Sequence, residues 1–319
     1  MFSRPRIIAA LAALAVATST VVAGTHTAAV AQSRPAVSLA VPAYFNDDAS
    51  WDRVFNTPQV KFVVGHPETP AAGKPYVSNK DLVAHLNQAK AKGITTLLYV
   101  TAGYDKVGWE VVADRIDSAL AAYPNADGVF LDEINYNQCD KYTSLSKGVG
   151  GVRGIRSRQP NKLIVLNPGA PMLNCYEGLA DGYLNLERAQ ADVPAWEANV
   201  NLAANAPFYA WMFTEANRPK MWQMVHSVSP SQIAAAVDGA LSRNASVLFV
   251  TPDVMPNPYD SLPDDSSWKA LLDRVDAYNS GKIALPAVKG PKLVPTTTTK
   301  PAVAKPVVKK KKKTVIRKK

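Results

Sequence analysis

The sequence is poor in the residues that several common catalytic centres need. It has four histidines and two cysteines in 319 residues. It contains no Gly-x-Ser-x-Gly elbow, no pair of histidines with zinc-ligand spacing, and no glycine-rich phosphate loop after its first apolar run. These absences argue against an elbow-type serine hydrolase, a zinc enzyme and a dinucleotide-binding fold. We predict neither a metal nor a cofactor.

Acidic residues are missing from both ends of the chain. The first 31 residues contain Arg4 and Arg6, and residues 289–319 contain 12 Lys and Arg. Removing these 14 positive charges from the formal total of +10 leaves −4 for residues 32–288. A mildly acidic globular body therefore carries a strongly basic tail.

The N-terminal 31 residues have the pattern of a secretory signal peptide. Two arginines precede the alanine-rich apolar stretch IIAALAALAVATSTVVAG, and AVA at positions 29–31 fits the small-x-small cleavage rule. We predict cleavage before Gln32 and a secreted or cell-wall-associated protein. The alternative is an uncleaved membrane anchor, which the many small residues disfavour.

The last 35 residues, 285–319, are rich in Pro, Thr and Lys and contain no aromatic residue. Such a segment cannot bury a core, so we predict that it is disordered. It is either a solvated end that aids solubility or an electrostatic tether to an anionic partner, such as a cell-wall polymer, anionic lipid or extracellular DNA. Nothing in it resembles a base-reading module, so no sequence-specific nucleic-acid recognition is predicted.

Eight short apolar runs follow one another between the two ends. Most are continuously apolar, which is typical of strands buried on both faces. The predicted strands cover residues 39–45, 60–66, 95–101, 127–133, 162–168, 181–187, 207–213 and 246–252. Helical patterns fill most of the gaps between them and close the body, at residues 78–93, 107–124, 229–244 and 266–281.

Strands that alternate with helices indicate parallel strands joined by crossover helices. Eight such units within about 250 residues predict a single-domain α/β fold, the (β/α)₈ TIM barrel, over residues 32–284. The alternative is an open doubly wound sheet, which the missing phosphate loop disfavours. We expect a monomer.

Carboxylates stand at the ends of two of these predicted strands. Asp132 and Glu133 end the fourth run, and Glu187 ends the sixth. Chemistry in a TIM barrel takes place at the C-terminal strand ends, and paired carboxylates cleave glycosidic bonds. Adjacent strand residues point to opposite sides, so Asp132 and Glu133 need not face each other. The alternative is that this pair is only a solvated strand end.

Aromatic side chains accompany the acids at the strand ends. The candidates for holding sugar rings include Tyr44 at the end of the predicted first strand, Tyr104 after the third and Trp211 in the predicted seventh. Each of them is also explained by packing alone. The two cysteines, Cys139 and Cys175, predict one disulfide in an exported protein. Two unpaired buried thiols are the alternative.

Several short motifs occur together in one order. They are VPAYF, GKPY, GITTLLYVTAGY, GVFLDE, NPG and LNLE. This set resembles the spherulin-4-like (spherulation-specific) proteins, which are TIM-barrel glycoside hydrolases, over roughly residues 38–280. The resemblance implies an endo-acting hydrolase of polysaccharides built from α-1,4-linked N-acetylgalactosamine or galactosamine, as found in microbial exopolysaccharide and biofilm matrix.

The resemblance also implies roles for individual residues. We predict Asp132 as nucleophile or charge stabiliser, Glu187 as general acid/base and Glu133 as a supporting acid, with the first two roles open to exchange. Asn167 and Tyr104 are sugar-binding candidates.

The segment GHPETPAAGKPY departs from the family pattern. His66 takes an Asn-like position there, and we add it to the binding candidates.

The sequence leaves two alternatives to the hydrolase function. One is a barrel that binds polysaccharide at the cell wall without cleaving it. The other is a polysaccharide deacetylase, but that chemistry usually needs a metal held by His and Asp, and we find no suitable cluster in the sequence.

Overall fold

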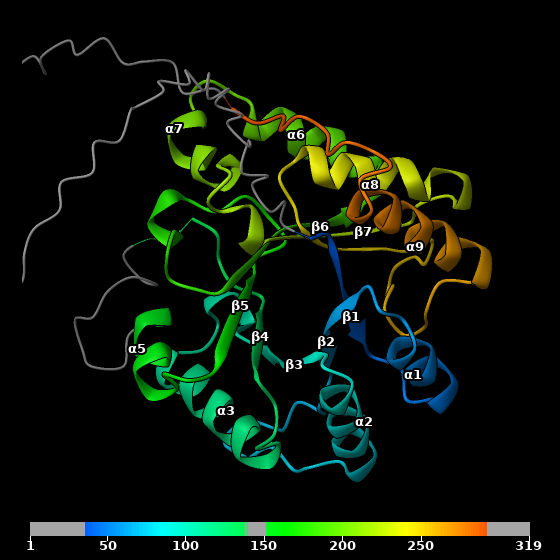
Figure 1. Ribbon diagram of the computed structural model, residues 1–319. Coiled ribbons are helices and arrows are strands. Elements are labelled where there is room, and N and C mark those ends of the chain that lie inside the picture. The colour runs from blue at the N-terminus through cyan, green and yellow to red at the C-terminus, as the bar shows by residue number, and fades with distance from the viewer. Residues whose placement is uncertain (1–35, 138, 140–150, 292–319) are drawn as a thin grey trace, which may run out of the picture. The chain divides into compact units, whose positions relative to one another are not determined.

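The structure is a computed structural model that describes residues 36–137, 139 and 151–291 (Figure 1). The predicted signal peptide, and the predicted tail from residue 292 onward, lie outside the described residues. Within the described part of the chain, no helix combines the length and the hydropathy needed to cross a membrane.

The predicted barrel is confirmed. Eight parallel strands follow one another around a closed sheet, and the eighth pairs with the first through Ser38 and Val247. The strands are β1 (Ser38–Ala43), β2 (Val60–Gly65), β3 (Thr95–Thr101), β4 (Gly128–Asp132), β5 (Leu163–Asn167), β6 (Gly182–Ala189), β7 (Met221–His226) and β8 (Val247–Val250).

Helices surround this sheet (Figure 1). The α-helices are α1 (Asp48–Phe55), α2 (Lys80–Ala91), α3 (Trp109–Ala122), α5 (Gly151–Arg158), α6 (Val193–Val200), α7 (Ala206–Tyr209), α8 (Ile233–Ser242) and α9 (Asp265–Asn279). Single 3₁₀ turns are η1 (Gly103–Asp105), η2 (Asn174–Tyr176), η3 (Gln190–Asp192), η4 (Ala210–Phe213), η5 (Arg218–Lys220) and η6 (Pro230–Gln232).

Side-chain caps set the starts of two outer helices. Asn79 precedes α2, and its side-chain oxygen accepts hydrogen bonds from the backbone N–H groups of Asp81 and Leu82. Asp264 precedes α9 and accepts from the backbone N–H groups of Ser266 and Ser267. Each cap satisfies N–H groups that have no partner within the helix, which fixes where the helix begins.

The prediction for the seventh strand is wrong. Residues 207–213 form α7 and η4, and β7 is MWQMVH at Met221–His226. The apolar composition of the first segment comes from packing on the outside of the barrel, because Met212 and Trp211 are buried there. Burial on both faces and burial under other loops leave the same apolar signature in a short run.

Strand register brings functional groups into one layer at the C-terminal edge of the barrel. Asp132 at the end of β4 pairs with Thr101 on β3 and with Asn167 on β5. The residues of β4 before Asp132 are all buried, as expected for a strand covered on both faces. The apolar run therefore ends where the interior of the barrel opens at its mouth.

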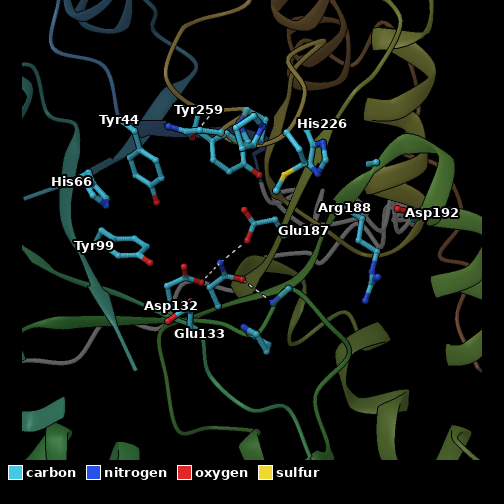
Figure 2. A pocket seen from close by; sticks show the side chains of 18 of the residues that line it. Tyr44, His66, Tyr99, Asp132, Glu133, Glu187, Arg188, Asp192, His226 and Tyr259 are labelled. Carbon is cyan, nitrogen blue, oxygen red and sulfur yellow. Dashed lines mark hydrogen bonds between the residues drawn. The ribbon is translucent and has the colours of Figure 1, made fainter. Parts of the chain in front are cut away.

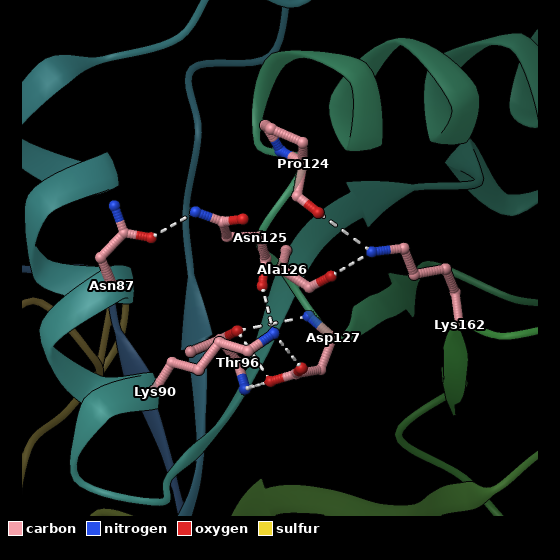
Figure 3. Close-up of polar contacts among 8 residues, drawn as sticks. All are labelled: Asn87, Lys90, Thr96, Pro124, Asn125, Ala126, Asp127 and Lys162. Carbon is pink, nitrogen blue, oxygen red and sulfur yellow. Dashed lines mark hydrogen bonds and ion pairs between the residues drawn. The ribbon is translucent and has the colours of Figure 1, made fainter.

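Hydrogen bonds from two sides hold the turn before β4, at the edge of the barrel opposite the C-terminal strand ends (Figure 3). Lys90 of α2 donates to the carboxylate of Asp127 at 2.7 Å and to the carbonyl of Asn125 at 2.8 Å. Lys162 donates to the carbonyl of Ala126 at 2.5 Å. Asp127 also accepts from the backbone N–H of Thr96 at 2.9 Å. These bonds hold the start of the strand that ends in Asp132.

The chain remains against the barrel after α9, beyond the predicted body boundary at residue 284. Leu285 packs on the core, and the backbone N–H of Lys289 donates to the carbonyl of Ser242 at 2.7 Å. Gly290 lies so close to the ring of Phe213 that an added Cβ would stand 2.3 Å from it. This segment therefore crosses the end of α8.

Candidate active site

A cavity of about 750 Å³ opens at the C-terminal edge of the barrel. That volume lies within the range of pockets that enclose small ligands. Its floor carries Asp132, Glu133, Asn167 and Glu187, and its walls include Tyr44, His66, Tyr99, Tyr104, Arg188, Asp192, His226 and the loop Met255–Tyr259. The predicted acids from β4 and β6 are therefore brought into one site.

Asn167 joins the two central carboxylates. Its side-chain nitrogen donates to Asp132 Oδ1 at 2.7 Å and to Glu187 Oε2 at 2.6 Å (Figure 2). Two oxygens bonded to one nitrogen cannot be farther apart than the sum of those distances, about 5.3 Å. Strands β4 and β6 are neighbours of β5 in the barrel, so the residue that bridges them comes from the strand between.

The motif NPG explains how this amide is oriented. The backbone N–H of Gly169 donates to Asn167 Oδ1 at 2.8 Å, which leaves the NH₂ group turned toward the carboxylates. Gly169 has φ +60°, a conformation that favours glycine, and an added Cβ would meet Glu187 Cβ at 3.5 Å. The left-handed backbone of Gly169 therefore helps to orient the Asn167 amide.

Glu133 faces a different partner from Asp132. Its carboxylate accepts a short hydrogen bond from the hydroxyl of Thr101. Its φ of 57° and the φ of 47° at Tyr104 are both in the left-handed region that non-glycine residues rarely adopt. The backbone N–H of Tyr104 donates to the carbonyl of Glu133 at 2.8 Å, which couples the two strained residues. Such strain often accompanies functional sites.

The charges in the site favour a proton on Asp132. Burial, and secondly the charge of Glu187, raise the pKa of Asp132 to about 7. A hydrogen bond from the backbone of Glu133 and one from the Tyr99 hydroxyl oppose this rise. A buried carboxylate next to a second one is costly to ionise, so Asp132 carries a proton below about pH 7.

Three tyrosines surround this pair. Figure 2 shows the hydroxyls of Tyr44, Tyr99 and Tyr259 directed toward Asp132 and Glu187 from different sides. Burial, followed by the charges of the carboxylates, raises the pKa of each phenol. All three therefore remain protonated at working pH and can only act there as hydrogen-bond donors or neutral acceptors.

The predicted binding residues do not all reach this cavity. Tyr44, His66, Tyr104 and Asn167 line it. Tyr104 is 52% exposed at the mouth. The His66 ring packs at a tilt against the rings of Tyr44 and Tyr99, at centroid distances of 4.8 and 4.7 Å.

Trp211 does not line this cavity, because it lies in η4 and not at the end of a strand. It is buried, donates to the carbonyl of Met172 at 3.0 Å and packs edge-on against Tyr183. It serves the packing of the loops behind the site.

The predicted disulfide between Cys139 and Cys175 is confirmed, with a Cα–Cα distance of 5.6 Å. It joins the segment after β4 to η2, which follows β5. The Tyr176 hydroxyl donates to the carbonyl of Asn135 at 2.5 Å beside it. The covalent bond and this hydrogen bond together hold the loops that follow Asp132 and Asn167.

Several residues that line the cavity were not predicted as site residues, among them Arg188, Asp192, His226 and Tyr259. His226 ends the true β7, so the misplaced strand hid it. Arg188 directly follows Glu187, and this position next to a predicted catalytic acid could have marked it as a site residue. Tyr259 lies in the long segment between β8 and α9, where no periodic pattern marks a residue that faces the site.

Comparison with known proteins shows that the chain matches the model of a known family. The model of spherulation-specific family 4 matches residues 38–275. The chain resembles the crystal structure of Aspergillus clavatus Sph3 in complex with GalNAc, with 21% identity, a TM-score of 0.55, and coverage of 76% of this chain and 98% of that one.

A GH18 chitinase from Pseudoalteromonas aurantia is more distant, with 14% identity, a TM-score of 0.46, and coverage of 74% and 99%. No curated protein matches the chain. The family model spans the barrel from β1 into α9 and includes all the residues of the site. The chain belongs to spherulation-specific family 4.

Proposed function

We propose that the protein is a secreted, endo-acting glycoside hydrolase that cleaves polysaccharide containing α-1,4-linked N-acetylgalactosamine or galactosamine. The observation that carries this proposal is the pair of carboxylates held by one amide, Asp132 and Glu187 on Asn167, on the floor of an open cavity. Two carboxyl groups flanking a bond are the machinery of glycoside hydrolysis. Family membership and the GalNAc complex of Sph3 support the choice of sugar.

The separation of the two acids supports a retaining mechanism. Their bridged oxygens are at most about 5.3 Å apart, the sum of the two hydrogen-bond lengths. Retaining enzymes place the carboxyl groups about 5–5.5 Å apart, whereas inverting enzymes leave roughly 6.5–9.5 Å for a water molecule. A covalent glycosyl-enzyme intermediate is therefore the expected route.

The proton on Asp132 supports different roles for the two acids, with Asp132 as the proton donor and Glu187 as the nucleophile. Asp132 donates its proton to the glycosidic oxygen as the C–O bond breaks, while the Glu187 carboxylate bonds to the anomeric carbon. Asp132, now ionised, then takes a proton from water, whose oxygen displaces Glu187 and completes hydrolysis. This is the exchanged version of the roles that the resemblance implied. The raised pKa of Asp132 is its support.

Glu133 supports this pair without joining it. Its hydrogen bond from Thr101 and its left-handed backbone fix the end of β4. The exposed ring of Tyr104, which the same backbone contact holds, would take the apolar face of a sugar ring at the mouth. We keep His66 and Tyr44 as further sugar contacts on that wall of the cavity.

The termini complete the proposal. The signal-like segment would export the protein, and the basic tail would hold it to an anionic cell-wall polymer or to extracellular DNA by charge alone. The signal-like segment and the part of the tail beyond residue 291 lie outside the described residues.

The test is a product assay on the purified protein with partially deacetylated α-1,4-N-acetylgalactosamine polymer, read by mass spectrometry. Wild type should release oligosaccharides, and Asp132→Asn and Glu187→Gln should release none. Glu110→Gln, which changes an exposed acid in the first turn of α3, is the matched control and should match wild type. Binding of the polymer without any product would replace the proposal by the rival, a non-catalytic polysaccharide-binding barrel.

A further inference from the structure

The Tyr259 hydroxyl is a buried polar group that the mechanism above leaves unused. Tyr259 is 5% exposed, and its oxygen has no hydrogen-bond partner among the described residues. Burying a hydroxyl without a partner is destabilising, so a group of this kind calls for an explanation. The hydroxyl lines the cavity and points at Glu187 (Figure 2).

The ring of Tyr259 has little freedom to move elsewhere. It packs edge-on against Tyr44 at 5.9 Å and against Phe249 of β8 at 6.2 Å between centroids. Its backbone carbonyl accepts from the N–H of Tyr44 at 3.3 Å, and its own N–H donates to Asn257 Oδ1 at 3.2 Å. The scaffold therefore fixes where the hydroxyl points.

The Glu187 carboxylate can accept a further hydrogen bond from this hydroxyl. Asn167 donates to Oε2, and a carboxylate oxygen pair accepts about four hydrogen bonds in all. Burial, followed by the charge and the acceptor oxygen of Glu187, raises the pKa of Tyr259, although the contact does not meet hydrogen-bond geometry. Catalytic hydrogen bonds are often long in free enzymes and tighten in the substrate complex.

We propose that Tyr259 is a positioning residue for Glu187, donating its O–H to the carboxylate opposite Asn167 and so holding Glu187 in line with the anomeric carbon. Tyr259 and Asn167 then fix the nucleophile from two sides. This inference deepens the proposed hydrolase function and rests on it for its kinetic consequences. The coupling between Tyr259 and Glu187 is measurable without turnover.

The first test is a double-mutant cycle on stability at pH 8, with wild type, Tyr259→Phe, Glu187→Gln and the double variant. Tyr259→Phe keeps the ring and removes only the hydroxyl. It should lower the Tm by about 3 °C in the wild-type background, because the attraction between the Tyr259 hydroxyl and the nearby Glu187 carboxylate is lost. The drop should largely vanish in the Glu187→Gln background. Equal effects in both backgrounds would overturn the proposal.

The second test is kinetic, on the substrate of the product assay. Tyr259→Phe should lower kcat by about 10–100-fold with KM within about twofold, and should move the acidic limb of the pH profile up by about one unit. The basic limb, which follows Asp132, should stay. The titratable groups that feel the charge of Glu187 are Tyr44, Tyr99, Tyr104, Asp132, His226 and Tyr259.

Two controls separate positioning from packing. Tyr99→Phe removes a donor to Asp132 and should move the basic limb instead. Tyr278→Phe, which removes a hydroxyl bonded to Asp238 on α8, should move neither limb. A kcat loss in Tyr259→Phe with both limbs unmoved would assign Tyr259 to packing and overturn the proposal. An inactive wild type with an intact Tyr259–Glu187 coupling would count against the hydrolase function alone.

Discussion

Asp132 and Asn167 stand opposite each other in the register of β4 and β5, and the Asn167 amide donates to Asp132 at 2.7 Å. The same nitrogen donates to Glu187, two strands from Asp132. A neutral donor between two carboxylates allows them to be close while one is charged. The arrangement answers why a buried strand ends in an acid: Asp132 is the point where the barrel interior meets the cavity.

Removing this amide should damage catalysis more than binding. We expect Asn167→Ala to lower kcat by about 100-fold, because both carboxyl groups lose a fixed hydrogen-bond donor. KM should change little. Steady-state kinetics on the polymer would measure both, with Asn87→Ala on the exposed face of α2 as control. A variant with normal kcat would remove Asn167 from the machinery.

The activity should have a basic limb near neutral pH. Asp132 has a pKa of about 7, and the proposed acid works only when protonated. Above about pH 7, kcat/KM should fall about tenfold per pH unit. A profile of kcat/KM from pH 4 to 9 measures this. Activity that stays level to pH 9 would show that the group donating the proton is not Asp132.

Asp132 should also make the fold less stable as the pH rises. Its pKa lies above the unfolded value of about 3.9, so between about pH 4 and 7 the folded state holds a proton that the unfolded chain has lost. Stability therefore decreases with pH across this window, by at most about 4 kcal/mol. Asp132→Asn should be more stable than wild type at pH 8 and equal to it at pH 4. Urea unfolding at both pH values would show the difference.

The disulfide should stabilise the loops behind the site. Cys139 and Cys175 enclose the segment from β4 to η2, so the Cys139→Ser, Cys175→Ser double variant should lose roughly 2–4 kcal/mol of unfolding free energy. Denaturant unfolding of the variant, and of wild type with and without dithiothreitol, measures this. A reductant effect on wild type with none on the variant is the internal control. Equal stability of both proteins would contradict the expected role.

The stabilisation of the turn before β4 by Asp127 should depend on pH in the opposite sense from that of Asp132. The Lys90 ion pair and the hydrogen bonds from Thr96 lower the pKa of Asp127 against the effect of its burial. Its stabilisation is therefore present above about pH 4 and is lost as the pH falls through the lowered pKa. Asp127→Asn should cost about 1 kcal/mol at pH 7 and less at pH 3. The same loss at both pH values would exclude the charge as its origin.

Much of this site could be predicted from the sequence because parallel strands deliver their C-terminal residues to one edge. Asp132, Asn167 and Glu187 each follow an apolar run, so knowing the barrel order was enough to bring them together. The role of Asn167 as a bridge needed the register. The seventh strand failed because PFYAWMF is apolar for reasons of outer packing. Tyr259 was missed because it sits on a segment whose path only tertiary contacts determine.

The most direct test of the account is ¹H NMR of the wild-type reaction, observing the reducing ends as they form from α-1,4-N-acetylgalactosamine polymer. Double displacement through Glu187 should give new reducing ends that appear first as the α anomer and then mutarotate. If the β anomer appeared first, a covalent intermediate on Glu187 would be contradicted. The absence of any new reducing end would contradict hydrolysis of this polymer altogether.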